Sequence, residues 1–341
     1  MTRSVRPLLA ALLLALAPAA QASYAEHDEA AGFIRDMQER HGFTADELRR
    51  LLGQATRLER VIDLIRPPAE RGPRSWQNYR ARFLTEARIE QGVAFWLAYR
   101  DSIEAASARY GVAPEYIVAI LGVETHYGRH TGNFETLSAL ATLAFDYPPR
   151  APLFRHELEN LLLLAREQQR DPFSYRGSYA GALGYPQFLP SSVRNYAVDF
   201  DSDGRVDFDT HPVDAIGSIA NYFAVHGWQP GQPVAQRVRL PDGLDPTPLI
   251  EAGIEPSLDP AALQTQGIHP VSGAFHPAPV TLVDLPTPDA ETEYWAGYRN
   301  FYVITRYNRS SFYAMAVFQL AEAVRQRYGE LGLQRASNST R

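Results

Sequence analysis

The stretch PEYIVAILGVETHYG, residues 114–128, decides the fold more than any other part of the chain. Pro114 suits the first turn of a helix, where no backbone N–H is required, and Gly128 is placed to end that helix. The residues between them are apolar nearly all round, which is typical of a helix buried on every side. Glu124, in the last turn, interrupts this apolar pattern. We therefore predict a buried helix that carries one carboxylate near its end.

Glu124 lies where a carboxylate gains no help from the helix dipole and is partly desolvated by its neighbours, and both effects raise its pKa. An acid kept protonated near neutral pH can donate a proton to a glycosidic oxygen. Judged on spacing alone, an exposed or salt-bridged glutamate is the more common outcome. A second carboxylate, which an ordinary hydrolase needs, is available only at Glu135 and Asp146, neither of them in a comparably apolar context.

Helical periodicity extends outward from this stretch in both directions. Residues 30–64 predict a pair of helices, with Thr44 as an N-cap and Glu47 three residues later, and residues 76–109 predict one or two more. Further helical patterns cover 137–145, 152–169, 191–198, 212–226 and 311–328. Helices thus make up most of the predicted fold.

The composition changes after Trp228, where Pro and Gly become frequent and short alternating segments at 234–240 and 280–285 predict strands. The fold class is mainly α (α+β), a helical domain with a small mixed α/β inserted lobe. The predicted organisation is a signal peptide (1–22), a helical catalytic domain (23–228), the lobe (229–292), a return to the core (293–328) and a flexible tail (329–341).

The N-terminus is typical of a secretory signal, with Arg3 and Arg6 before the apolar run of residues 8–16 and a small-residue cleavage site at Ala20-Gln21-Ala22. The run is too short for a bilayer span, which takes roughly twenty residues. The chain has no cysteine. Disulfides, thiol chemistry and a lipoprotein anchor are therefore excluded, and we expect a soluble periplasmic protein without a membrane anchor.

Charge narrows the class of partner. The formal net charge is −6, and loss of Arg3 and Arg6 with the signal would make it −8, which argues against nucleic acid and against an anionic membrane surface. No lysine occurs, which excludes Schiff-base chemistry. The 34 Tyr and Phe residues suit sugar stacking, although most such rings belong to cores.

Long blocks of the chain resemble the lytic murein transglycosylase B family, glycoside hydrolase family 103, within the lysozyme-like, goose-type group. The matching blocks are AILGVETHYGRHTGNFETLSALATLAFDYPPR (119–150), RGSYAGALGYPQFLPSSVRNYAVDFDSDG (176–204), HPVDAIGSIANYFAVHGW (211–228) and FYVITRYNRSSFYAMAVFQLAEAV (301–324). They occur in the family's order and span most of the mature chain. The resemblance implies a lysozyme-like catalytic domain that acts on peptidoglycan glycan strands, with other cell-wall enzymes as potential partners.

The resemblance also implies roles for particular residues. Glu124 matches the family's sole catalytic acid/base. The family's pattern often has two consecutive arginines where this chain has Pro149 and Arg150, so only one guanidinium contact to substrate is supported. The other residues that the resemblance assigns to the sugar groove are Ser178, Gln187, Phe188, Tyr222, Tyr307 and Asn308. Aromatic rings stack on the C–H faces of sugars, and the polar side chains bind hydroxyls, although such polar residues more often serve turns and caps.

The segment from Asp199 to Gly204 matches the opening of a calcium loop, with Asp199, Asp201 and Asp203 at positions one, three and five. Position twelve is Thr210 instead of the usual Glu, and the nearest carboxylate is that of Asp209. A structural calcium ion and a plain Asp-rich turn remain equally open. No cofactor is expected to be required.

These observations favour a lytic transglycosylase that cleaves between N-acetylmuramic acid and N-acetylglucosamine and forms a 1,6-anhydromuramoyl product. Because water is not consumed, one carboxylate suffices. The alternatives are a muramidase on the same fold, a non-catalytic peptidoglycan-binding protein, and a calcium-sensing module that rests on the Asp199 loop alone.

Overall fold

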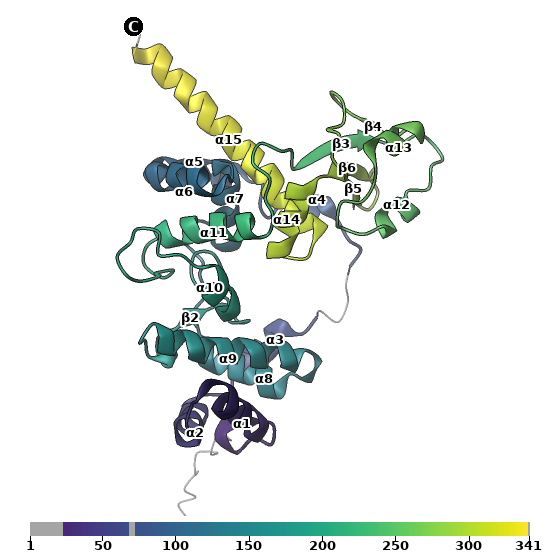
Figure 1. Cartoon of the computed structure of the whole chain (residues 1–341). Helices are drawn as coiled ribbons and strands as arrows, with labels where there is room; N and C mark the ends of the chain where they lie inside the picture. The colour runs from purple at the N-terminus through teal and green to yellow at the C-terminus, as the bar shows by residue number, and fades with distance from the viewer. Residues whose placement is uncertain (1–22, 68–71, 340–341) are drawn as a thin grey trace, which may run out of the picture. The chain divides into compact units, whose positions relative to one another are not determined.

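The computed structural model describes residues 23–67 and 72–339, so the predicted signal peptide (1–22) lies outside the described residues. Two compact units are present, with the boundary between Arg57 and Leu58. The prediction from sequence did not include this division. The elements are labelled in Figure 1.

The first unit contains the 3₁₀ turn η1 (Tyr24–Glu26) and the helices α1 (Ala30–His41) and α2 (Ala45–Gln54). The hydroxyl of Thr44 accepts the N–H of Glu47 at 3.2 Å, which confirms the predicted N-cap. The predicted pair of helices over residues 30–64 is in fact three, because α3 (Glu59–Ile65) is a separate helix of the second unit.

The second unit is built around α7 (Pro114–Thr125), which contacts α5, α6, α11 and α15. Its residues from Tyr116 to Gly122 are all buried, as the apolar pattern predicts. The helices of this unit, besides α3 and α7, are α4 (Trp76–Arg80), α5 (Glu86–Ala98), α6 (Arg100–Tyr110), α8 (Thr136–Asp146), α9 (Ala151–Glu167), α10 (Pro190–Tyr196), α11 (Val213–Val225), α12 (Thr247–Glu251), α13 (Pro260–Thr265), α14 (Arg299–Tyr307) and α15 (Ser311–Ser339).

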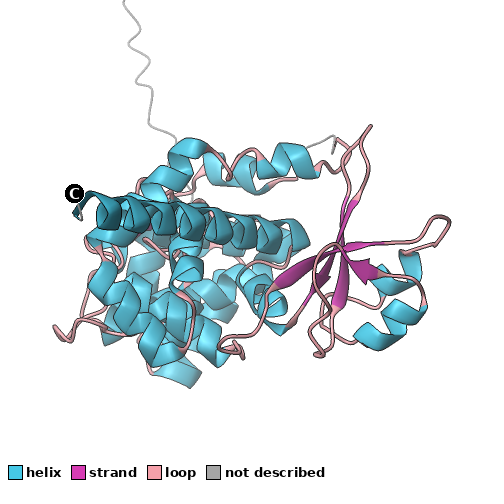
Figure 2. Cartoon of the chain, turned by 90° about the horizontal axis from the view of Figure 1, so that it is seen from above, coloured by secondary structure: helices cyan, strands magenta, loops and turns pink. Residues whose placement is uncertain are grey.

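The lobe contains a four-stranded antiparallel sheet in the order β4-β3-β6-β5. Its strands are β3 (Ala235–Arg239), β4 (His269–Pro270), β5 (Thr281–Leu285) and β6 (Glu293–Gly297). Figure 2 shows them in magenta, gathered in one group. β6 pairs with both β3 and β5, so the sheet continues past residue 292 into the range predicted to return to the core.

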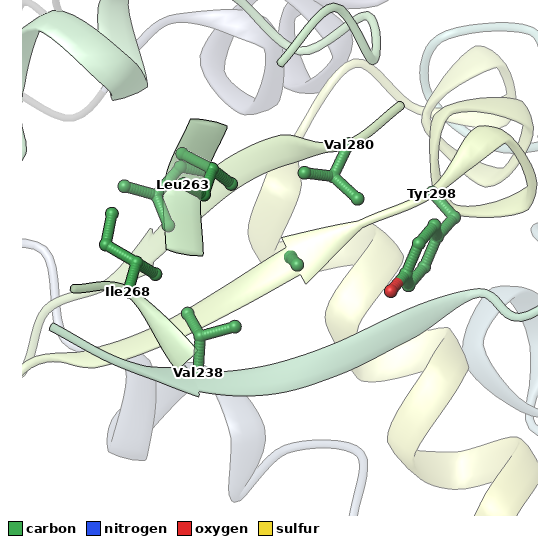
Figure 3. Close-up of a cluster of buried hydrophobic side chains, with 7 residues drawn as sticks. Val238, Leu263, Ile268, Val280 and Tyr298 are labelled. Atoms are coloured by element: carbon green, nitrogen blue, oxygen red, sulfur yellow. The ribbon is translucent and has the colours of Figure 1, made fainter. Parts of the chain in front are cut away.

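The lobe has a hydrophobic core of its own, in which Val238, Leu263, Ile268, Val280 and Tyr298 are buried together (Figure 3). These side chains come from β3, α13 and the segments next to β4, β5 and β6. Since alternate residues of a strand share one face, Val238 and its neighbours turn a single apolar face of the sheet toward α13. The lobe is thus a packed substructure within the unit.

Short elements complete the second unit. The two-residue strands β1 (Phe134–Glu135) and β2 (Arg176–Gly177) pair antiparallel, and the 3₁₀ turns are η2 (Pro148–Arg150) and η3 (Pro172–Ser174). Bridges from Leu183 to Gly177 and to Phe188 fold residues 177–188 into a tight loop region.

Two predicted helix ends differ from the structure. α7 ends at Thr125, before Gly128, because His126 and Tyr127 already adopt left-handed conformations. α15 continues to Ser339, past the predicted end at Tyr328, because Gly329 lies within the helix instead of ending it and no proline follows. None of the helices in the described ranges is long and apolar enough to cross a membrane.

Candidate active site

Glu124 lies in the last turn of α7, where the chain turns through three consecutive left-handed residues. The φ angles are 54° at His126, 59° at Tyr127 and 85° at Gly128. Glycine adopts this conformation freely, whereas each of the other two costs on the order of 1–3 kcal/mol. Such strain persists only where the surroundings fix the backbone.

The surroundings of Tyr127 supply that constraint. Its ring lies directly against Gly92 and Gly122, where a Cβ atom at either glycine would collide with it. Its hydroxyl donates to the carbonyl of Arg88 at 3.1 Å, and the Arg88 guanidinium donates to the carbonyl of Gly122 at 2.7 Å. A cation on a carbonyl near the end of a helix is favourable for the dipole. The end of α7 is therefore held from α5.

Thr125 fixes the other side of the turn. Its hydroxyl is in contact with the carbonyl of Tyr185 at 3.1 Å and accepts the N–H of Gly128 at 2.9 Å. The Tyr185 ring fills the space where a side chain at Gly128 would lie. Glycine at 128 is thus required by close packing as well as by its φ angle.

The side chain of Glu124 is in an aromatic environment with one direct polar partner. The hydroxyl of Tyr313 on α15 donates to Glu124 Oε1 at 2.5 Å. Burial raises the pKa of Glu124 to about 7, and the hydrogen bond from Tyr313 opposes that rise by stabilising the carboxylate. No ion pair to Glu124 occurs within the described ranges. A proton is therefore held on this carboxyl up to neutral pH.

Two other tyrosines lie close enough to sense this charge. Burial raises the pKa of Tyr79 and of Tyr307, and the negative charge of Glu124 contributes to both shifts. The hydroxyl of Tyr307 donates to the carbonyl of Pro186 at 2.5 Å, and its ring is parallel to that of Tyr313 with centroids 6.5 Å apart. Phenol groups thus surround Glu124, and no cation of the described residues forms an ion pair with it.

Phe188 and Tyr222 are buried and pack against the ring of Tyr307. Their ring centroids lie 5.7 and 5.0 Å from that of Tyr307, and they are 2% and 7% exposed. The Tyr222 hydroxyl donates to the carbonyl of Arg306 at 2.7 Å. Neither ring presents a free face, so the stacking on sugar expected for Phe188 and Tyr222 does not fit this geometry.

Ser178 and Gln187 shape the loop region that carries Pro186. The Ser178 hydroxyl accepts the N–H groups of Ala180 and Ala182, at 3.3 and 3.0 Å. Gln187 has a left-handed φ of 52°, and its side-chain N–H₂ donates to the carbonyls of Thr131 and Gly184 at 3.0 and 2.9 Å. Because both amide hydrogens are used, the free group of Gln187 is its acceptor oxygen.

Asn308 and Arg150 are the exposed members of the predicted set. Asn308 directly follows Tyr307 at the end of α14. The Arg150 guanidinium lies over the ring of Phe154, 5.2 Å from its centroid, in η2 between α8 and α9. No hydrogen bond or ring contact connects Arg150 with Glu124 or Tyr307 in the part of the chain that the structure describes.

Glu135 and Asp146, the two candidates for a second catalytic carboxylate, do not form a pair with Glu124. Glu135 caps α8: one oxygen accepts the N–H groups of Leu137 and Ser138, and the other accepts the Ser138 hydroxyl at 2.6 Å. Asp146 lies at the opposite end of α8 from Glu135. Glu124 therefore stands without a paired carboxylate among these candidates.

The sequence reasoning missed Tyr313 and Tyr79. Tyr313 is separated from Glu124 by 189 residues, and only the folding of α15 against α7 brings them together. A usable signal existed, because Tyr313 belongs to the same quoted block as Tyr307 and Asn308.

The predicted calcium loop gathers three of its four proposed ligands. Carboxylate oxygens of Asp199, Asp201 and Asp203 all lie within 4.8 Å of one another, and Gly204 has the left-handed φ of 92° that the sharp turn needs. These residues fit the first half of a calcium loop.

Asp209 does not join them. Its carboxylate pairs with the Arg170 guanidinium at 2.8 Å and lies outside the cluster of Asp199, Asp201 and Asp203, so this structure does not support its prediction as a calcium ligand. The reason is tertiary: folding brings Arg170, at the end of α9, to this carboxylate, and a sequence pattern does not reveal such a partner. The position-twelve residue, Thr210, hydrogen-bonds to Asp207.

Comparison with known proteins gives consistent matches. Residues 25–322 match the family model described as the transglycosylase SLT domain. The chain is 43% identical over 313 residues to the membrane-bound lytic murein transglycosylase B of Escherichia coli strain K12, covering 88% of this chain and 84% of that protein.

Solved structures agree. The Escherichia coli lytic transglycosylase Slt35 in complex with calcium is 43% identical, with a TM-score of 0.79, covering 89% of this chain and 95% of that one. SltB3 from Pseudomonas aeruginosa in complex with NAG-anhNAM-pentapeptide is 30% identical, with a TM-score of 0.76, covering 87% and 79%. The mainly helical, lysozyme-like class predicted from the sequence is confirmed.

Proposed function

We propose that Glu124 is the catalytic acid and base of this chain, which belongs to the transglycosylase SLT domain family and is a lytic transglycosylase acting on peptidoglycan. The observation that carries the assignment of Glu124 is its environment: a carboxyl with a pKa raised to about 7, hydrogen-bonded to one phenol and without an ion pair among the described residues. The scissile bond proposed is the β-1,4 bond from N-acetylmuramic acid to N-acetylglucosamine.

In the first step, Glu124 protonates the glycosidic oxygen. Tyr313 donates to Oε1, so Oε2 is the oxygen from which the proton leaves. The sugar develops oxocarbenium-like charge, which the substrate's own acetamido group stabilises. As Glu124 becomes a carboxylate, the Tyr313 hydrogen bond strengthens with the growing charge.

In the second step, the Glu124 carboxylate takes the proton of the C6 hydroxyl on the same muramoyl residue. Attack of that oxygen on C1 closes a 1,6-anhydro ring and restores the acid. Water takes no part, so no second carboxylate is required, and Glu135 is left to cap α8. The bound NAG-anhNAM-pentapeptide of SltB3 supports an anhydro product for this family.

Substrate contacts are proposed for the accessible side chains around the acid. The Gln187 acceptor oxygen and the Ser178 hydroxyl hydrogen remain available for sugar hydroxyls and amides. Tyr307 and Asn308 extend the same surface, and Arg150 is a more distant candidate contact. We assign Phe188 and Tyr222 a supporting role instead, in which they fix the Tyr307 ring.

Two further aspects belong to this proposal. The carboxylates of Asp199, Asp201 and Asp203 would hold a structural calcium ion, as the calcium complex of Slt35 suggests, and the ion takes no part in the reaction.

The place of action proposed is the periplasm, where peptidoglycan lies, reached through the signal at residues 1–22. Other cell-wall enzymes are the expected partners of the protein.

Mass spectrometry of digested cell-wall sacculi tests the function. We expect muropeptides lighter by one water than their hydrolysed counterparts, because the ring closes internally. Reducing-end muramic acid as the main product would instead assign a muramidase. Sacculi that remain intact would leave only the non-catalytic binding protein.

A further inference from the structure

A pocket beside Glu124 contains arginines that the proposed mechanism does not use. Its volume is about 400 Å³, and it is formed by the segment before α4, by α4 and its following turn, and by the start of α15. Its lining includes Arg74, Ser75, Asn78, Tyr79, Arg82 and Phe312.

The pocket is adjacent to the site of the acid. Tyr79 lines it, and the charge of Glu124 contributes to the raised pKa of that tyrosine. Phe312 packs edge-on against Tyr79 at 5.6 Å and directly precedes Tyr313, which donates to Glu124. Tyr79 and Phe312 therefore connect the lining of the pocket with the surroundings of the reacting carboxyl.

A buried residue, Trp76, supports the side chains that line the pocket. Trp76, 1% exposed, lies at the start of α4 and packs edge-on against Phe312 at 5.4 Å. The backbone N–H of Trp76 donates to the carbonyl of Pro286 at 2.8 Å, which ties α4 to the chain after β5. The side chains that line the pocket are thus presented from a fixed helix.

The described lining of the pocket carries two arginines and no carboxylate. The Arg74 guanidinium lies 4.6 Å above the Phe312 ring, and the charge of Arg82 acts on Tyr79. Neither arginine forms an ion pair with a carboxylate of the described residues. Arg327 on α15, by contrast, pairs with Glu86 and Glu90. Two guanidinium groups without a carboxylate partner among the described residues, in a chain of net charge −6, favour an anionic ligand.

We propose that this pocket binds a carboxylate of the peptidoglycan strand, carried on the lactyl side of the muramoyl residue next to the scissile bond. This inference rests on the proposed function. Sugar hydroxyls are neutral and need no cation, whereas the acidic peptide stem carries carboxylates that guanidinium groups bind in a fork geometry. The Asn78 amide adds a neutral donor. On strands without stems, the free lactyl carboxylate offers the same chemistry.

The test compares the wild type with Arg74→Gln/Arg82→Gln and with a control, Arg237→Gln/Arg239→Gln, which removes the same charge from exposed positions of β3. The substrates are intact strands, strands whose carboxylates are amidated with carbodiimide and ammonia, and strands stripped of stems by an amidase, each assayed for kcat and KM. Thermal unfolding verifies that every variant is folded.

We expect amidation to raise the KM of the wild type and of the control roughly tenfold, the effect of one charge-assisted hydrogen-bonded contact. The pocket variant should show that higher KM on intact strands already and no further change on amidation. Intact strands carry free carboxylates only on their stems, so stripped strands show what else the pocket accepts: a high wild-type KM means that the stem is required, and a low one that the lactyl carboxylate freed by the amidase can replace it.

The inference is overturned if amidation affects the pocket variant as strongly as the wild type, or if the variant binds intact strands normally. A separate outcome tests the function on which this inference rests. If the wild type cleaves none of the three substrates, the transglycosylase assignment itself is contradicted.

Discussion

Glu124 and the aspartates of the Asp199 loop are carboxylates in opposite environments. Glu124 lies among phenol groups, with one hydrogen bond from Tyr313 and a raised pKa. The loop carboxylates are exposed at Asp201 and Asp203 and half-buried at Asp199, and they accept backbone N–H groups, as when Asp199 accepts those of Asp203 and Gly204 at 3.1 and 2.8 Å.

The difference shows that burial and the number of hydrogen-bond donors together set the protonation state of a carboxylate. That state decides whether the carboxylate suits a general acid or a metal ligand. Several N–H donors and access to water favour the ionised form, which suits a hard cation. One phenol donor in a desolvated place leaves the protonated form competitive at neutral pH, which suits a general acid.

The largest expected effect follows from removing the acid. Glu124→Gln should lower the lytic rate on sacculi by a factor of at least roughly a hundred, the contribution of a positioned general acid. Glu115→Gln is the matched control. Glu115 lies on the same helix and burial also raises its pKa, but it is paired with Arg325 at 3.8 Å. Equal losses in the two variants would mean that α7 needs both carboxylates for structure.

The pH dependence of the lytic rate tests the raised pKa of Glu124. Because the acid form of Glu124 is the active one, the lytic rate should fall as the pH rises through about 7. Tyr313→Phe removes the bond that stabilises the carboxylate, so the pKa rises further and the decline moves to higher pH. Tyr298→Phe, which removes a buried hydroxyl bonded to Gln236 in the lobe, should leave the profile in place. A profile that Tyr313→Phe does not move would contradict this assignment.

Calcium binding tests the role proposed for the carboxylates of the Asp199 loop. Added calcium should raise the unfolding temperature of the wild type by a few degrees, through ligand binding to the folded state. Asp199→Asn should abolish that response. Asp209→Asn should retain it, because Asp209 pairs with Arg170. Loss of the response in Asp209→Asn alone would restore the original ligand prediction.

The smallest effect concerns stability. The pKa of folded Glu124 is above its unfolded value of about 4.5, so the folded state binds the proton more tightly and stability declines as the pH rises from about 4.5 to 7. Glu124→Gln lacks this titration. Between pH 5 and 8 the wild type should lose roughly 1–3 kcal/mol relative to the variant, after allowance for partial exposure. Parallel denaturant titrations measure the difference, and equal pH slopes would refute the raised pKa.

The sequence predicted those features whose signals are local. The apolar run of α7, the position of Glu124 in its last turn, the Thr44 cap and the opening of the Asp199 loop each depend on residues a few positions apart. Helical periodicity and capping chemistry are contained within such windows.

The remaining features depend on contacts that only folding creates. The left-handed end of α7 exists because the Tyr127 ring fits against Gly92 and Gly122. Tyr313 reaches Glu124 from α15, and Arg170 reaches Asp209 from the end of α9. No local pattern encodes these pairs, which is why a helix end, a hydrogen-bond partner and a metal ligand were missed or misplaced.

The central claim is that one carboxyl, Glu124, serves as acid and then as base without the participation of water. Digestion of sacculi in heavy-oxygen water tests it most directly. The claim predicts muramoyl products that contain none of the heavy oxygen, and a digest by Glu124→Gln that releases almost none of them. Heavy oxygen at C1 of the released muramoyl residue would contradict it, because water would then be the nucleophile.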